Sequence, residues 1–400
     1  PLPTMAGTIS VNLPAVVAGD TTIREVSFQA EPATSGWRVE GFRAMLPGRT
    51  KLEAGGLLGT GDGFGFKGNL IVASTQPSGL ANWLGAGIAT PALRLLSGAG
   101  FSANVDLAPG MQRFDALELA VGSSMLKGSA SRRTDGERPL VELALKGDTL
   151  DLGMFAAFGG MFVNGSADLP DLGHDLALTL DAGPVTASGL EADAFGLTAR
   201  VKEDRADIDR LMVTNLAGAS LSATGSLTDL SLTPSGTVDV SIVSADGAEL
   251  ISTLAAQFSG PDWLSLAADR IGATPDLLSD AQLSFIASTA PEDKDRSWTL
   301  SGNAKAASGS ASFTGNWKSG EDLGDADGGW QVTATQQEPL NFLSLAGVEL
   351  VPLGAPGPAT VELKANGKPD VSLELDLAYS ADGTAATFAG TRSSGADGPQ

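Results

Sequence analysis

The sequence has no cysteine, one histidine and no run of about 18 or more consecutive apolar residues. Without cysteine the chain forms no disulfide and no thiolate metal site, so disulfide pairing gives no information on its compartment. A lone histidine offers little to catalytic triads or zinc sites, which combine histidine with specific partners. No segment is long and apolar enough to span a bilayer as a helix. We therefore expect no enzyme active site, no metal and no cofactor.

Basic residues are also scarce. The chain has 25 lysines and arginines against 47 aspartates and glutamates, which gives a formal net charge of −22. This charge repels nucleic acid backbones and anionic membrane surfaces, and no cluster of basic residues reverses it locally. Nucleic acid is therefore excluded as a partner, and the charge mainly favours solubility.

The apolar residues are mostly small or branched, because aromatic residues make up only 6% of a chain that is 42% hydrophobic and has 51 glycines. This composition leaves enough material for a buried core and suits a sheet with many tight turns. The first residue is Pro1, and no basic and apolar leader follows it. We expect that the sequence begins within a longer chain.

A short motif, two glycines that enclose small residues and Leu, Met or Phe, recurs along the chain. Its first glycine follows Pro47, Ser308 or Asp382 in three copies, and such dipeptides favour turns. We predict a β-hairpin turn at each copy. The copies are Gly48–Gly55, Gly122–Gly128, Gly218–Gly225, Gly309–Gly315 and Gly383–Gly390.

Segments near these turns alternate apolar and polar residues, the pattern of a strand with unlike faces. The apolar positions are Phe114, Leu117, Leu119 and Val121; Val141, Leu143 and Leu145; Leu176, Leu178 and Leu180; Ile208, Leu211 and Val213; Val238, Val240 and Ile242; and Val371, Leu373, Leu375 and Leu377. Short apolar segments with helical character follow the alternation, beginning at Gly79, Leu150, Ala245 and Glu338. The last copy reaches Gln400 before such a segment begins.

The pattern predicts an all-β fold with short helices, an elongated repeat array of antiparallel strands that forms a curved, groove-like sheet. We expect one repeat array, a fragment of a longer chain. Its approximate units are 1–97, 98–165, 166–260, 261–347 and an incomplete 348–400.

The stretch from Leu176 to Phe258, which contains LALTLDAGPVTASGLEADAFGLTARV, and PLVELALKGDTLDL from Pro139 to Leu152 resemble the AsmA family of bacterial envelope proteins. The resemblance covers essentially the whole chain at the level of the repeat. It implies a periplasmic body of repeating β-groove units and a role in outer-membrane assembly or phospholipid traffic. It also implies attachment to the inner membrane by a segment outside this sequence, and envelope proteins as partners at the ends of the full-length chain. The family has no catalytic residues to carry over.

An apolar sheet face suits lipid because keeping on the order of thirty methylenes of a phospholipid from water is worth about 25 kcal/mol. We therefore expect a phospholipid or another acyl lipid as the ligand. The candidate groove residues are Leu117, Leu119, Val121, Leu143, Leu145, Leu178, Leu180, Val238, Val240, Ile242, Leu363, Leu373, Leu375, Trp83 and Leu84. The alternation is equally typical of a filled core, so a structural or adhesive β-repeat protein without a ligand stays open. A membrane barrel is disfavoured because its aromatic girdles need more than one tyrosine.

Other chemistry-bearing residues have simpler interpretations. His174 lies among Pro and Gly in an expected loop, and Gly59–Gly65 has no following Lys-Ser/Thr and is expected to be a hairpin. Asp322, Asp325 and Asp327 have no complete calcium-loop spacing and indicate an exposed acidic loop. We expect the tryptophans to fill repeat junctions and not to stack on sugars or bases. They are Trp37, Trp83, Trp263, Trp298, Trp317 and Trp330.

Overall fold

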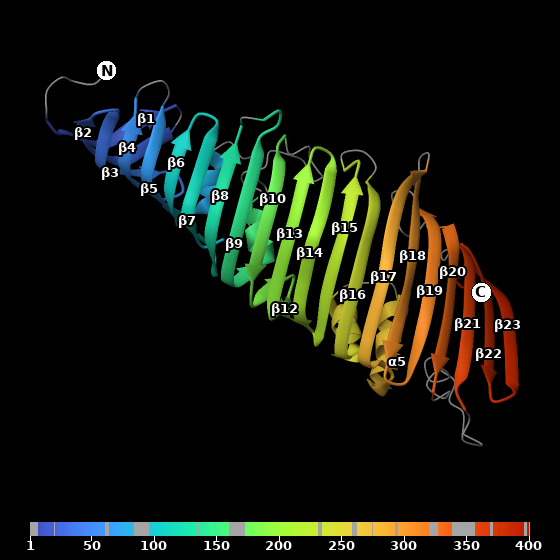
Figure 1. Cartoon of the computed structure of the whole chain (residues 1–400). Coiled ribbons are helices and arrows are strands. Elements are labelled where there is room, and N and C mark those ends of the chain that lie inside the picture. The colour runs from blue at the N-terminus through green and yellow to red at the C-terminus, as the bar shows by residue number, and fades with distance from the viewer. Residues whose placement is uncertain are drawn as a thin grey trace. The chain divides into compact units, whose positions relative to one another are not determined.

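The structure is a computed structural model. It describes residues 7–19, 21–60, 64–83, 96–134, 136–159, 173–230, 234–257, 262–273, 275–292, 295–319, 327–337, 357–368, 371–395 and 398–399. The chain divides into two compact units, Pro1–Glu203 (unit 1) and Asp204–Gln400 (unit 2). Each unit consists almost entirely of β-strands joined by turns and short helices (Figure 1).

Unit 1 begins with an antiparallel meander in which each strand pairs with the next one along the chain, from β1 to β9. Its strands are β1 (Ile9–Ala18), β2 (Thr21–Ala33), β3 (Gly36–Leu46), β4 (Thr50–Gly59), β5 (Gly65–Ser74), β6 (Ala99–Ala108), β7 (Met111–Val121), β8 (Ser124–Arg133) and β9 (Leu140–Asp151). Helix α1 (Pro77–Trp83) follows β5, and α3 (Leu152–Gly159) follows β9.

After α3 the pairing changes, because β10 (Asp175–Ala182) lies parallel to β9. β10 then forms an antiparallel hairpin with β13 (Ala194–Lys202). The tip of this hairpin is a smaller pair, β11 (Val185–Ala187) and β12 (Leu190–Ala192). β11 also pairs parallel with the end of β9, so the hairpin stays in register with β9 beyond the interruption at Gly183.

Unit 2 is an antiparallel meander throughout its described strands. These are β14 (Arg205–Leu216), β15 (Ala219–Thr228), β16 (Ser235–Asp246), β17 (Ser279–Glu292), β18 (Asp295–Ala306), β19 (Gly309–Ser319), β20 (Asp327–Gln336), β21 (Ala359–Lys368), β22 (Ser372–Ala381), β23 (Thr384–Gly395) and β24 (Gly398–Pro399). Between β16 and β17 lie α4 (Gly247–Gln257), α5 (Asp262–Ala273) and the 3₁₀ helix η2 (Pro275–Leu278).

The five glycine motifs lie at hairpins, as predicted. Gly48 joins β3 to β4, Gly122 joins β7 to β8, and Gly218 joins β14 to β15. Gly309 begins β19 after β18, and Gly383 lies between β22 and β23. In each unit these turns lie at the same ends of the strands as the helices. We call this side of the sheet, which is formed by strand ends and not by an outermost strand, the helix edge of that unit. The turn and helix elements of the motif therefore occupy one edge of the sheet.

Close approach of a helix explains two of these glycines. Gly48 has φ +73°, and a Cβ there would lie 2.5 Å from the backbone nitrogen of Leu80 in α1. Gly122 has φ +60°, and a Cβ there would lie 2.8 Å from Sδ of Met154 in α3. Any other residue would be strained in its backbone at both positions. At Gly48 it would also collide with the backbone of α1, whereas at Gly122 it would displace the flexible side chain of Met154. These glycines therefore form the hairpin turns and allow the helices to pack close to them.

Bulges keep apolar side chains on one face where successive apolar residues are three positions apart and not two. The register shifts between Phe114 and Leu117 in β7, and between Ile208 and Leu211 in β14. Ala116 adopts φ +48° at the first of these positions. An extra residue at a bulge returns the next side chain to the same face. Phe114 and Leu117 consequently share a face although they are three positions apart.

The predicted fold class is confirmed in each unit: the protein is all-β with short helices, and its strands form curved, mostly antiparallel sheets with one apolar face. The helical segments predicted from Gly79, Leu150 and Ala245 correspond to α1, α3 and α4. The segment predicted from Glu338 lies outside the described residues, and α5 corresponds to no predicted helical segment. The hairpin prediction for Gly59–Gly65 is confirmed, since Gly59 pairs with Gly65. The boundaries of the sequence repeats stay predictions.

Candidate functional site

One face of the unit 1 sheet is apolar and the other carries charge. In β6 the apolar side belongs to Ala99, Phe101, Ala103 and Val105, which alternate with polar residues. Cross-strand partners keep the same side: Phe101 pairs with Leu119, and Leu119 pairs with Leu126. We call this side the apolar face of unit 1.

Ion pairs cover the opposite face of unit 1. Lys127 Nζ lies 2.9 Å from Glu118 Oε1, and Lys67 Nζ lies 3.2 Å from Asp106 Oδ2. The hydrogen bond from Lys51 is the largest cause that lowers the pKa of Glu53. These pairs are solvent-exposed, and such pairs contribute little to stability. They mark the outer, water-facing side of the sheet.

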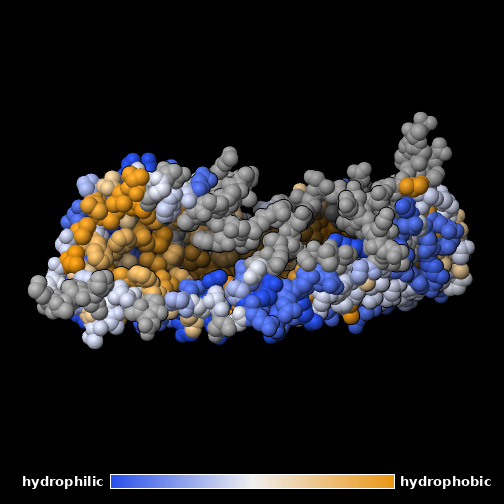
Figure 2. Space-filling view, turned by 90° about the horizontal axis from the view of Figure 1, so that it is seen from above, coloured by the Kyte–Doolittle hydropathy of each residue, from blue (hydrophilic) through white to orange (hydrophobic). Residues whose placement is uncertain are grey.

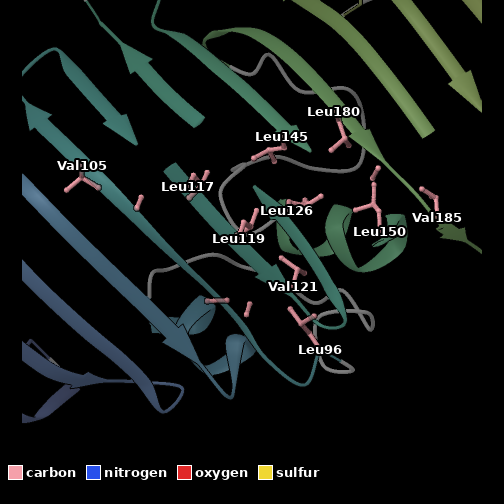
Figure 3. Packing of buried hydrophobic residues seen from close by; sticks show 14 residues of the cluster. Leu96, Val105, Leu117, Leu119, Val121, Leu126, Leu145, Leu150, Leu180 and Val185 are labelled. Atoms are coloured by element: carbon pink, nitrogen blue, oxygen red, sulfur yellow. The ribbon is translucent and has the colours of Figure 1, made fainter. Parts of the chain in front are cut away.

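In the middle of unit 1 the apolar face is filled by protein (Figure 3). Leu126 and Val121 are completely buried, and Leu150 is 2% exposed. Leu152 and Phe155 of α3 pack against this group. We call the group the unit 1 cluster. Its members are Ala81, Leu96, Ala99, Ala103, Val105, Leu117, Leu119, Val121, Leu126, Leu145, Leu150, Leu180, Ala182 and Val185.

Toward the N-terminal strands the apolar face of unit 1 opens. Ile9 and Leu13 of β1 are 44% and 43% exposed. In β2, Phe28 pairs with Val11 of β1 and with Phe42 of β3. Figure 2 shows hydrophobic side chains gathered in a hollow at this end of the unit, with hydrophilic residues at its rim. One sheet thus carries a filled stretch and an accessible stretch of the same face.

Unit 2 also has an apolar face, but its large side chains stay partly accessible. The face runs across paired strands: Val240 pairs with Ala223 and Phe285, and Leu363 pairs with Val332 and Leu377. Val240, Phe285 and Leu363 are all half-buried. Among the described residues of unit 2, the buried apolar side chains are Ala219, Ala223, Ala248, Leu277, Ala359, Ala365 and Ala381.

A cavity of about 350 Å³ lies on this face at the helix edge of unit 2. Its walls are Ile242, Leu250, Ile251, Leu277 and Leu283, from α4, η2 and the strands beside them. Its floor includes three alanines in register, because Ala311 of β19 pairs with Ala304 of β18 and with Ala334 of β20. Side chains this small leave room above the sheet. The volume and apolar walls are typical of a small-molecule site. We call it the unit 2 cavity.

Three tryptophans form a stack on the apolar face of unit 2, toward the edge opposite the helices. The ring centroids of Trp298 and Trp317 are 6.0 Å apart, and those of Trp317 and Trp330 are 4.9 Å apart, with nearly parallel planes. Trp330 lies over Gly315, where a Cβ would approach the indole to 2.5 Å. Trp330 is 38% exposed, so the stack is accessible on the face.

The stack was not predicted from the sequence, because the tryptophans were expected to fill repeat junctions. A signal was present. Trp298 and Trp317 are equidistant from the turn at Ala307 and Ser308, so a hairpin centred there pairs them directly.

The structure divides the predicted groove residues into two groups. In unit 1, Leu117, Leu119, Val121, Leu145 and Leu180 belong to the unit 1 cluster, and Leu143 and Leu178 pack against it. In unit 2, Val238, Val240, Ile242, Leu363, Leu373 and Leu375 are half-buried on the apolar face, and Ile242 also lines the cavity. Trp83 ends α1 and is half-buried, whereas Leu84 lies outside the described residues.

The structure describes two of the candidates for other chemistry. His174 is half-buried just before β10, and Asp327 begins β20, while Asp322 and Asp325 lie outside the described residues. In the part of the chain that the structure describes, no group of three or more His, Cys, Asp and Glu side chains could hold a metal ion. Nor is any described helix long and apolar enough to cross a membrane.

Comparison with known proteins yields no protein-family model, no curated protein and no solved structure that matches this chain.

Proposed function

We propose that this protein is a non-enzymatic lipid-binding or lipid-transport scaffold of the bacterial periplasm, of the AsmA-like kind that the sequence resembles, with a role in outer-membrane or envelope biogenesis. The observation that carries the proposal is the apolar face of unit 2. Its large side chains are half-buried, and a cavity of about 350 Å³ opens on it at the helix edge. Partly accessible apolar surface of this extent favours an apolar occupant.

The energetics support an acyl chain as that occupant. Each methylene removed from water is worth roughly 0.8 kcal/mol, so ten methylenes along the face contribute about 8 kcal/mol before the cost of ordering the chain. Leu, Ile and Ala side chains across β16 to β20 supply this contact, and the polar side chains of Ser244 and Gln336 beside them are hydrogen-bonded to Gly218 and Ser308. An uncharged, flexible chain fits such a surface better than a peptide or a sugar does.

A second candidate function has an observation in its favour. The unit 1 cluster fills the same kind of face with protein, and several groove candidates belong to it. A structural β-repeat protein with a filled core and no ligand predicts this packing throughout. The half-exposed side chains of unit 2 favour the lipid scaffold over that alternative.

The test compares two valines of β16 that lie on opposite faces. Val240 is on the apolar face, and Val243 is on the other face and 50% exposed. We expect the purified full chain to retain phospholipid, measured by extraction and mass spectrometry. Val240→Asp should lower the bound lipid at least several-fold because a carboxylate on the face costs free energy beside hydrocarbon. Val243→Asp should leave it unchanged.

Two results would count against the proposal. One is a purified protein that neither retains phospholipid nor takes it up from vesicles. The other is equal lipid loss in both variants while circular dichroism shows both folded, since the apolar face would then have no special role.

A further inference from the structure

The apolar face of unit 2 carries a basic residue at one end. Strand alternation and register assign each side chain of β15 to β22 to one face of the sheet. Among the side chains that the structure describes in these strands, charged residues lie on the opposite face, with two exceptions. One is Asp246 at the helix edge, whose Oδ1 accepts a hydrogen bond from the backbone N–H of Ala248 in α4. The other is Arg296 of β18, at the edge opposite the helices.

Arg296 lies beside the tryptophan stack. It precedes Trp298 by two positions in a strand without register shifts, so both side chains are on the apolar face. Arg296 itself is half-buried. Guanidinium groups bind phosphate through paired, charge-assisted hydrogen bonds, and tryptophan rings favour the boundary between hydrocarbon and polar groups. A cation next to three indoles therefore matches the polar end of a phospholipid.

The cavity lies at the other end of the same strands, at a distance that fits one lipid. From Arg296 to Ala304 on the cavity floor is eight residues of β18, roughly 26 Å at the usual rise of a strand. A bilayer with its headgroups is about 40–45 Å thick, so a single phospholipid is roughly 20–22 Å long. The strand distance is a few ångströms longer, a difference that the long side chain of arginine can span. The tryptophan stack lies between these ends, as the ester region does in a lipid.

We infer that unit 2 binds one phospholipid along its strands in a fixed direction. Arg296 binds the phosphate, the stack of Trp298, Trp317 and Trp330 contacts the glycerol esters, and the unit 2 cavity holds the end of an acyl chain. The inference rests on the proposed function and adds a ligand class and an orientation to it. In a chain with a net charge of −22, a cation on the apolar face also gives an anionic headgroup a local partner.

The orientation is tested by photolabelling the full chain with two phospholipids of the same headgroup. One carries a diazirine next to its ester and the other near the methyl end of its chain. The ester-end label should attach to peptides that contain Trp298, Trp317 or Trp330. The methyl-end label should attach to peptides that contain Leu277 or Leu283. A reversed pattern, or both labels spread evenly over the face, would overturn the orientation.

The role of Arg296 is tested by comparing phosphatidylglycerol with a diacylglycerol that has the same chains and no phosphate. Arg296→Gln should weaken phosphatidylglycerol binding about tenfold and leave diacylglycerol binding unchanged. The reason is that only the lipid with a phosphate makes a charge-assisted hydrogen bond to Arg296 that the variant can lose. Arg296→Lys should recover part of the loss. Lys364→Gln removes one positive charge from the opposite face and serves as the matched control.

The outcomes separate this inference from the proposed function. Equal loss for both lipids in Arg296→Gln, or the same loss in Lys364→Gln, would contradict the phosphate contact while lipid binding stands. Displacement of phosphatidylglycerol by inorganic phosphate at similar concentration would indicate a free phosphate site and also contradict it. If the unaltered protein binds neither lipid, the proposed function fails and this inference fails with it.

Discussion

The middle of unit 1 and the helix edge of unit 2 are built from strands with the same alternation of apolar and polar residues. Protein side chains fill the apolar face in unit 1, whereas a cavity lies on it in unit 2. In unit 1, Leu119 pairs with Leu126, and Leu152 and Phe155 of α3 cover the sheet. In unit 2, Ala304 pairs with Ala311 below a cavity. The difference is one of side-chain volume: strand alternation decides which face is apolar, and residue size decides whether that face is closed.

The same contrast indicates which interactions stabilise each unit. The unit 1 cluster buries Leu126, Val121 and Leu150 almost completely, so its packing is that of an ordinary protein interior. Across β16 to β22 of unit 2, large side chains keep part of their surface, and the described buried apolar residues are small apart from Leu277. Unit 2 therefore derives a larger share of its stability from strand pairing, and a bound apolar ligand would add to it.

The largest effect is expected in the filled region. Leu126→Ala removes a side chain that is 0% exposed and leaves a cavity in the unit 1 cluster. Substitutions of this kind cost about 2–5 kcal/mol. Chemical denaturation should show this loss, and hydrogen exchange should place it in β7 to β9. A cost below about 1 kcal/mol would mean that the middle of unit 1 is as loosely packed as the face of unit 2.

A smaller effect is expected at the matching leucine of unit 2. Leu363 is half-buried between Val332 and Leu377, so Leu363→Ala loses only part of its transfer free energy, about 1 kcal/mol. The loss should grow when the protein is saturated with phospholipid, because the variant then also loses contacts with the ligand. Denaturation with and without added lipid measures both values. A loss that does not respond to lipid would contradict a ligand-contacting role for this side chain.

Much of this architecture is encoded in local sequence. The glycine motifs at Gly48 and Gly122 predict the hairpins because few residues tolerate positive φ, and the three-residue spacing from Phe114 to Leu117 signals the bulge in β7. The parallel pairing of β9 with β10 has no such local signal, because it depends on how the chain returns after α3.

The candidate site was only partly predictable for a related reason. Alternation places Leu145 and Val240 on apolar faces equally well, yet Leu145 is buried in the unit 1 cluster and Val240 is only half-buried. The outcome depends on which side chains of neighbouring strands and helices meet them, and that is a property of long-range contacts. The tryptophan stack needed the strand register as well, which the turn at Ala307 and Ser308 supplies.

The smallest effect on stability, and the most direct test of the comparison, comes from making unit 2 resemble unit 1. Ala334 lies on the cavity floor between Ala311 and Val361, and Ala334→Leu places a branched side chain into the space of about 350 Å³. Because the cavity has room, stability should stay unchanged or rise by about 0.5–1 kcal/mol. Phospholipid binding should fall, since the leucine occupies the volume assigned to the chain end.

The control for this variant is Thr333→Leu on the neighbouring position of β20, which faces the other side of the sheet. It adds a side chain of the same size and should leave lipid binding unchanged, with both proteins compared by lipid titration and by denaturation. If Ala334→Leu binds phospholipid as well as the unaltered chain does, the cavity does not hold the acyl chain. If Ala334→Leu instead unfolds unit 2, the cavity does not have room for the added side chain. The two units would then not differ in how much space the apolar face leaves.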